Sequence, residues 1–171
     1  MNRLAHAVRA TGGTVVWIVW RVDPNSEKRW RVFFDHVLGS TASEHFRRVF
    51  SPGHEGQALW PELDYQPGDV LVEKTNFSGF SGSHGRLEAS LRERGLDTLL
   101  IAGTVTNICC ESTAREAAFL EFKTIMVSDA NAGYSSTDNA VTFTTFMNFG
   151  DVMSSGEVIE RLAASAPGGS V

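Results

Sequence analysis

Two adjacent cysteines, Cys109 and Cys110, are the side chains of this sequence best suited to nucleophilic chemistry. They follow an apolar run at 99–102 and a turn of small residues, and they open a segment with helical spacing. Thr106 or Asn107 is a suitable N-cap for that helix. A helix N-terminus favours a thiolate over a thiol, and its free N–H groups can receive an oxyanion. Cys109 is therefore a candidate nucleophile; the alternative is that both thiols pack as small apolar groups in a strand-to-helix corner.

Lys74 is the second candidate for chemistry. It follows the apolar run 70–73, at the carboxyl end of an expected central strand. A lysine in that position can hold a nearby cysteine as thiolate through its positive charge. The alternative is an ordinary solvated lysine at the end of a strand.

The remaining residue patterns give no sign of a metal or cofactor. The five histidines have no metal-ligand spacing, and no D-x-H or H-E-x-x-H motif occurs. The glycines at 79, 82 and 85 match neither the dinucleotide-binding nor the P-loop pattern. We therefore expect neither a metal nor another cofactor.

Short strands alternating with helices must position these side chains. Four β-branched, apolar runs predict buried strands, at 14–22, 70–73, 98–102 and 124–128. Helical spacing occurs at 2–10, 87–94, 107–122, 137–149 and 157–164. This alternation predicts a three-layer α/β/α fold with a mostly parallel sheet. In such folds ligands bind in the crevice at the carboxyl ends of the strands.

The segment 23–64 shows no clean period and is rich in aromatic residues. Connections of this length usually cover an active site, form an interface, or do both. We expect it to shape a pocket and to contribute to a homo-oligomer.

Composition restricts the class of protein. The 171 residues, of which 42% are hydrophobic and 20% charged, suit one soluble domain, expected at 1–165 with a flexible tail at 166–171. The formal charge of −5 argues against nucleic acid as a partner. No apolar run is long enough to cross a membrane. Adjacent cysteines rarely form a disulfide, so we expect reduced thiols and a cytoplasmic location.

Two segments together resemble the isochorismatase-like cysteine hydrolases. They are Lys74-Thr-Asn-Phe-Ser78-Gly-Phe80 and Gly103-Thr-Val-Thr-Asn-Ile-Cys109-Cys-Glu-Ser-Thr113-Ala-Arg-Glu-Ala117. The resemblance runs from residue 1 to about residue 153. The cysteine segment is most similar to those of biuret hydrolases, N-carbamoylsarcosine amidohydrolases and ureidoacrylate amidohydrolases. It is less similar to that of nicotinamidases, whose metal-binding D-x-H is absent.

The resemblance implies an isochorismatase-like, Rossmann-like fold and an Asp–Lys–Cys triad. Cys109 would be the nucleophile and Lys74 its partner, with the N–H groups of Thr106 and Cys109 as the oxyanion hole. A cis peptide bond would fall at Val105–Thr106. Phe80, Val105 and Asn107 would contact the substrate.

The aspartate of the triad has no counterpart in this sequence. In the family it lies on a first, central strand that precedes the helix beginning here at Asn2. We therefore expect a sheet without that strand, in either a fragment of an active enzyme or a family member with a broken triad. Asp23, just beyond an expected strand end, is the least unfavourable substitute.

Three functions remain open from the sequence. The first is a cysteine hydrolase that cleaves a C–N bond of a small amide, ureido or N-carbamoyl compound through a Cys109 thioester. The second is a binding or assembly module that keeps the pocket without turnover. The third is hydrolysis of a vinyl ether of the isochorismate type, in which the cysteine is dispensable.

Overall fold

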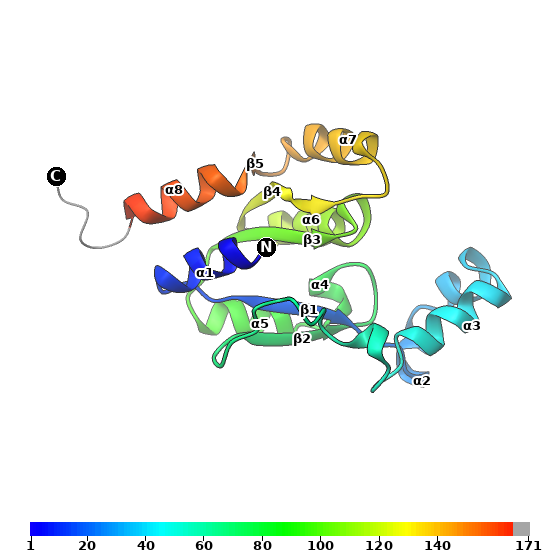
Figure 1. Ribbon diagram of the computed structural model, residues 1–171. Coiled ribbons are helices and arrows are strands. Elements are labelled where there is room, and N and C mark those ends of the chain that lie inside the picture. Colours follow the sequence, from blue (N-terminus) through cyan, green and yellow to red (C-terminus); the bar gives the residue numbers. More distant parts are fainter. Residues whose placement is uncertain (166–171) are drawn as a thin grey trace.

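The computed structural model describes residues 1–165, so the tail expected at 166–171 lies outside the described residues. The chain forms an α/β fold with parallel strands between two layers of helices, as predicted (Figure 1). The strands are β1 Val16–Trp20, β2 Val70–Lys74, β3 Thr98–Thr104, β4 Lys123–Ala132 and β5 Asp151–Met153. The α-helices are α1 Asn2–Ala10, α2 Pro24–Arg29, α3 Ser40–Val49, α4 Gly79–Gly82, α5 Arg86–Glu93, α6 Glu111–Phe119, α7 Ser136–Phe146 and α8 Ser155–Ser165.

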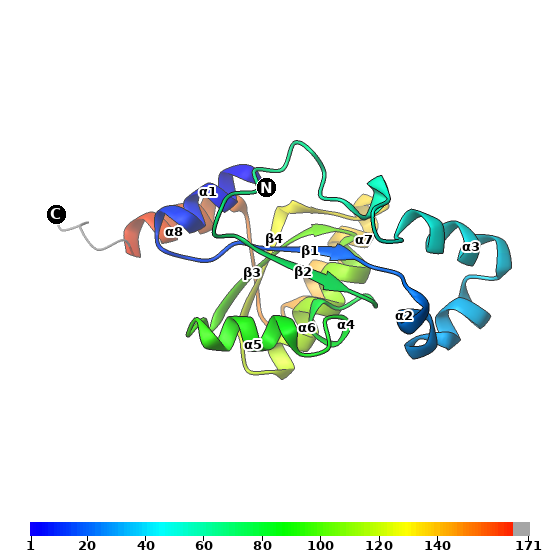
Figure 2. The ribbon, with the colours of Figure 1, turned by 90° about the horizontal axis from the view of Figure 1, so that it is seen from below.

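The sheet is divided into two parts (Figure 2). In one part β1 pairs with β2 in parallel, from Val16 opposite Val70 to Trp20 opposite Lys74. In the other part β3 pairs with β4, and β4 with β5, again in parallel. Within residues 1–165, the edge of β1 away from β2 and the edge of β3 away from β4 have no strand partner. This division agrees with a sheet that lacks one central strand.

Side chains alternate along the strands and build a core on each face of the sheet. On one face, Leu100 and Val127 pack against α1 and α8. On the other face, Ile101 and Met126 pack against α6 and α7. A further cluster joins β1 and β2 to α5 and the end of α6. The helices therefore cover both faces, and the strands lie in the middle layer.

The ends of several elements differ from the sequence-based expectation: β1 is shorter than 14–22, β4 extends beyond 124–128, and α7 ends before 149. The helix predicted at 107–122 is divided into a π-helical turn, Thr106–Cys110, and α6, which ends at Phe119. It stops there because Glu121 takes a left-handed conformation, with φ of 62°. The three-residue strand β5 was not predicted, because so short a segment carries no periodic signal.

The aromatic segment 23–64 folds into α2, a π-helical turn Phe33–Val37, α3 and a 3-10 turn Glu55–Gln57. Figure 1 shows α2 and α3 standing beside the carboxyl ends of β1 and β2. The aromatic rings of this segment pack mainly against each other and against β1. Trp20, for example, meets Phe46 edge-to-face with ring centroids 5.1 Å apart. We call this group the aromatic cluster; it contains Trp20, Val22, Trp30, Phe33, Phe34, Leu38, Phe46, Phe50 and Phe77.

Candidate active site

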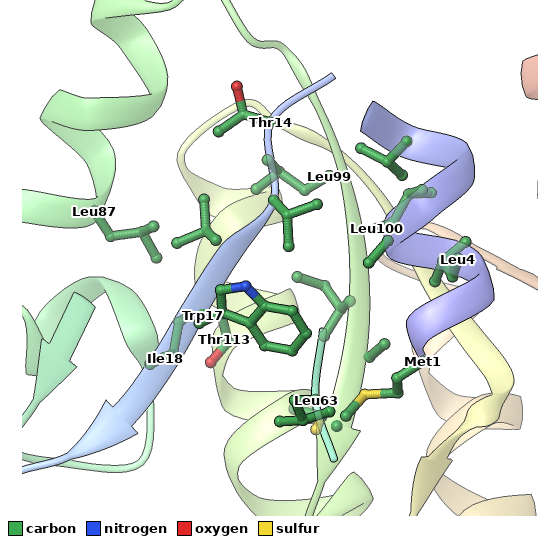
Figure 3. A pocket seen from close by; sticks show the side chains of 18 of the residues that line it. Met1, Leu4, Thr14, Trp17, Ile18, Leu63, Leu87, Leu99, Leu100 and Thr113 are labelled. Atoms are coloured by element: carbon green, nitrogen blue, oxygen red, sulfur yellow. The ribbon is translucent and has the colours of Figure 1, made fainter. Parts of the chain in front are cut away.

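A cavity of about 660 Å³ lies between β1 and β3. Side chains from both strands and from α1 surround it in Figure 3, with Leu63 of the long connection at one end. Lys74 and Cys109 both line it, as does Phe80. Its volume suits a small organic molecule. Lys74, at the end of β2, and Cys109, in the turn after β3, therefore line the same cavity.

Lys74 is buried at the carboxyl end of β2, with only 5% of its surface exposed. Its Nζ donates a hydrogen bond of 2.6 Å to the carbonyl oxygen of Phe77 and lies 5.1 Å from the ring centroid of Trp20. No carboxylate of the described chain forms an ion pair with it. Lys74 is therefore a desolvated cation without a counter-charge, unlike an ordinary solvated lysine.

The two cysteines lie in the turn that follows β3, in different surroundings. Both cysteines line the cavity, but Cys109 is only half-buried. Cys110 is buried and packs with Ala114, Met126 and Phe146. Burial raises the pKa of the Cys110 thiol to about 12, although nearby Lys74 opposes the shift. At neutral pH Cys110 is protonated, which leaves Cys109 as the accessible nucleophile.

The chain changes direction between β3 and the π-helical turn at a cis peptide bond. This bond joins Thr104 to Val105, so the expectation of a cis bond at Val105–Thr106 is wrong by one residue. The pairing of β3 with β4 continues to Thr104, and the helical turn begins at Thr106, so Val105 alone links the two. The carbonyl oxygen of Val105 accepts hydrogen bonds from the N–H groups of Ile108 and Cys110, on either side of Cys109.

Thr113 connects the cysteine turn to the lysine loop and was not predicted as a site residue. Its hydroxyl donates to the carbonyl oxygen of Cys109 at 2.6 Å and accepts from the N–H of Gly79 at 2.9 Å. A Cβ at Gly79 would lie 2.8 Å from Cδ1 of Ile18 and 3.1 Å from Cδ2 of Leu87, so a side chain there would force these two to shift. The only sequence signal was a hydroxyl residue four positions after Cys109, which commonly bonds back to a helical carbonyl.

The other expected contact residues lie outside the cavity lining. Thr106 is fully buried, and Val105 and Asn107 do not line the cavity. The side-chain oxygens of Thr106 and Asn107 are buried without hydrogen-bond partners. Phe80 does line the cavity but is almost wholly buried, in the cluster formed by α5 and β2. Cys109, Lys74 and Phe80 are therefore brought together, whereas the side chains of the other three are not.

The described part of the chain supplies no carboxylate to the cavity lining. Asp23, the suggested substitute, instead caps α2 by accepting from the N–H groups of Asn25 and Ser26, and it pairs with Arg21. The hydrogen bond from the Ser26 N–H is the main cause that lowers the pKa of Asp23. Asp23 is therefore a helix cap and does not replace the aspartate of the triad.

Within residues 1–165, no group of three or more histidine, cysteine, aspartate or glutamate side chains is placed to hold a metal ion. No helix in this range is both long and apolar enough to cross a bilayer.

The sequence and fold match known proteins along most of the chain. The isochorismatase domain model matches residues 1–157. The ureidoacrylate amidohydrolase of Rhizobium rhizogenes is 33% identical over 122 residues, which cover 70% of this chain and 49% of that protein. The chain thus spans about half the length of this curated relative. The corresponding enzyme of Pseudomonas syringae is 33% identical over 165 residues, covering 90% of this chain and 66% of the relative.

Solved structures agree with this assignment. A cysteine hydrolase from Pseudomonas syringae has a TM-score of 0.77 and 29% identity, covering 95% of this chain and 78% of its own. An N-carbamoylsarcosine amidase from Thermoplasma acidophilum has a TM-score of 0.70 and 26% identity, covering 90% of this chain and 79% of its own. Together with the domain match and the cysteine segment, these similarities show that the chain belongs to the isochorismatase family.

Proposed function

We propose that this protein is a cysteine hydrolase that cleaves the C–N bond of a small amide, ureido or N-carbamoyl compound. The observation that carries the proposal is the placement of half-exposed Cys109 and desolvated Lys74 on one cavity, while Cys110 is buried and protonated. The similarity to proteins named ureidoacrylate amidohydrolase and N-carbamoylsarcosine amidase supports this class of substrate.

In the proposed reaction the Cys109 thiolate attacks the carbonyl carbon, forming a C–S bond and an oxyanion. The N–H groups of Thr106 and Cys109 stabilise that oxyanion at the start of the helical turn. Collapse of the intermediate breaks the C–N bond, and the nitrogen leaves as ammonia or an amine after taking a proton. Water then attacks the thioester, releasing the acid and regenerating the thiolate.

In this reaction Lys74 supplies a positive charge and solvent water transfers the protons. The buried ammonium of Lys74 places a positive charge on the cavity that Cys109 lines, because no carboxylate of the described chain neutralises it. Thr106 is fully buried and is not among the lining residues, so its backbone N–H enters the proposal through the family resemblance alone. Because residues 1–165 place no carboxylate on the lining, these residues leave water to carry the protons to and from the reacting atoms. We therefore expect slow turnover from these residues alone.

Ammonia release from biuret, N-carbamoyl amino acids and primary amides tests the proposal. The variant Cys109→Ser is expected to lose turnover, because a serine hydroxyl has no adjacent base to activate it. The matched variant Cys110→Ala is expected to keep it, because Cys110 packs among apolar side chains. Equal loss in both variants, in folded protein, would contradict the assigned roles.

A binding or assembly module is the second candidate. The observation that favours it is the cavity lining, which holds a nucleophile and a cation but no carboxylate from the described residues. Such a protein would bind amide or ureido compounds with measurable affinity and release no ammonia. Calorimetric titration alongside the ammonia assay separates the two candidates.

The expected location and assembly complete the proposal. Reduced adjacent thiols suit the cytoplasm. Val32 and Val37, beside the aromatic cluster, are 66% and 68% exposed, which suits contact with a second copy in a homo-oligomer. Sedimentation velocity tests the assembly, and a monomer at all concentrations would contradict it.

A further inference from the structure

The side chain of Thr113 contacts two segments that are distant in sequence: the cysteine turn, 106–110, and the loop 75–82, which we call the lysine loop. Thr113 belongs to α6 and is only 6% exposed. Its hydroxyl donates to the carbonyl oxygen of Cys109 and accepts from the backbone N–H of Gly79, 34 positions earlier. One hydroxyl therefore bridges the turn that carries the nucleophile and the loop that follows the lysine.

The direction of both hydrogen bonds is fixed by the groups involved. A backbone N–H can only donate and a carbonyl oxygen can only accept. The single hydroxyl proton of Thr113 must therefore point to the Cys109 carbonyl, which leaves a lone pair for the Gly79 N–H. A side chain of the same shape without a hydroxyl would leave the Gly79 N–H without its acceptor, and an unpaired backbone N–H is costly when it is buried.

The lysine loop also holds the ammonium of Lys74. Lys74 Nζ donates to the carbonyl oxygen of Phe77, two residues before Gly79. Ser78, which lies between these two, caps α4 by accepting from the N–H of Phe80. The position of the ammonium therefore depends on a short loop that is anchored to α6 at Gly79.

This anchor is the buried one of two hydrogen bonds that join the lysine loop to α6 within residues 1–165. The other runs from the Ser81 N–H to the Glu116 carboxylate, at an exposed position where water competes for both groups. Gly79 is instead buried, and the side chains of Ile18 and Leu87 crowd it. We therefore expect the buried bond to fix the loop.

A local role does not account for both contacts of this hydroxyl. A threonine in a helix commonly bonds back to the carbonyl four residues earlier, and the bond to Cys109 is of that kind. The bond from Gly79 comes from a different element and makes the threonine a cross-link. We propose that Thr113 is a positioning residue, whose hydroxyl holds the lysine loop and the cysteine turn in the relative placement that reaction at Cys109 requires. This role rests on the proposed hydrolysis, in which Lys74 and Cys109 act on one cavity.

The rate at which Cys109 reacts with dithiobis(nitrobenzoate) tests the proposal without a substrate. Thr113→Val keeps the shape of the side chain and should slow the reaction about fivefold, the factor that corresponds to one neutral hydrogen bond. Thr113→Ser keeps the hydroxyl and should restore the rate. The matched control is Thr142→Val: Thr142 is 2% exposed and its hydroxyl joins α7 to Glu111 of α6, so the rate should stay unchanged.

Two further measurements separate positioning from a general loss of stability. In the Lys74→Met background, Thr113→Val should slow Cys109 by less than about twofold, because the loop no longer carries a charge to be placed. In turnover of an N-carbamoyl or ureido substrate, Thr113→Val should lower kcat and change KM by less than about twofold, because a hydroxyl engaged on both sides does not bind substrate.

The comparison of Thr113→Ser with Thr113→Ala isolates the same hydroxyl, and it replaces the comparison of wild type with Thr113→Val where the valine variant does not fold. Four results would overturn the proposal. They are an unchanged Cys109 rate without the hydroxyl, equal slowing in the serine variant, equal slowing in Thr142→Val, and a full fivefold effect in the Lys74→Met background. A wild type that releases no ammonia would contradict the proposed hydrolysis, whereas the thiol rates would still decide the role of Thr113.

Discussion

The thiols of Cys109 and Cys110 should react at very different rates, although the two residues are adjacent. Burial raises the pKa of Cys110 from the ordinary 9.0 to about 12. This shift lowers the thiolate population about a thousandfold at neutral pH. A more basic thiolate is a better nucleophile, which with a Brønsted slope near 0.45 returns a factor of about 20. Cys110 should therefore react with a disulfide reagent about 50-fold more slowly than an ordinary cysteine, before steric exclusion is counted.

The assay is reaction of the native protein with dithiobis(nitrobenzoate), followed by the absorbance of released thionitrobenzoate. We expect one fast equivalent, from Cys109, and a second only after unfolding in urea. The variant Cys110→Ala should keep the fast equivalent and Cys109→Ala should lose it. Two equivalents released at similar rates from the native protein would refute the reasoning, because the burial of Cys110 could then not suppress its thiolate.

Three other expectations follow from charged residues. Lys74→Met should slow the reaction of Cys109, because the cavity that both residues line loses a buried positive charge. Exposed Lys123→Met is the matched control, and equal rates in the two variants would contradict the role of Lys74. Asp69→Asn should lower the free energy of unfolding in urea by about 2 kcal/mol, because the Asp69 side chain is only 3% exposed and accepts charge-assisted hydrogen bonds from Arg9. The exposed control Asp35→Asn should lower it by less than about 0.5 kcal/mol. Hydrogen bonds from the Arg9 guanidinium hold the pKa of Asp69 well below the ordinary value. The stability that the Asp69 carboxylate contributes is therefore complete above about pH 4 and is lost as the pH falls further. Urea midpoints measured from pH 6 to 3 should fall more steeply in the wild type than in Asp69→Asn.

The elements that position the site follow from local patterns. The helix at Asn2–Ala10 was predicted with its observed ends, because an apolar stripe runs into the Gly12–Gly13 break. The buried strands β2 and β3 were predicted to within two residues of their ends, because β-branched and apolar residues fill both of their faces. The alternation of these elements is sufficient to predict the parallel α/β fold and the crevice that contains Lys74 and Cys109.

The helices α2 and α3 were hidden from periodicity analysis. α2 contains no aromatic residue and α3 only Phe46, and the aromatic residues around them pack against one another beside the sheet, so no stripe faces a common core. Trp30, for example, stacks on Phe33 with ring centroids 4.0 Å apart, at a spacing of three residues. Such contacts depend on how the chain folds back on itself, which the local sequence does not encode.

The site itself was predictable in its residue types more than in its geometry. Glu111 and Arg115, four residues apart on α6, form an ion pair with an N–O distance of 2.6 Å that is half-buried. Arg115 also stacks on Phe149, and Thr142 donates to Glu111. The extra partners come from α7 and the loop after it, which are distant in sequence. The same holds for Trp20, which covers the Lys74 ammonium from the neighbouring strand.

Trapping of a covalent intermediate tests the central claim most directly. The protein is mixed with an N-carbamoyl or ureido substrate, quenched in acid within milliseconds to seconds, and measured by intact mass spectrometry with peptide mapping. The account predicts an added acyl mass on the peptide containing Cys109, present in Cys110→Ala and absent in Cys109→Ser. An acyl group on Cys110, or ammonia release that persists in Cys109→Ser, would contradict the assignment of Cys109 as the nucleophile.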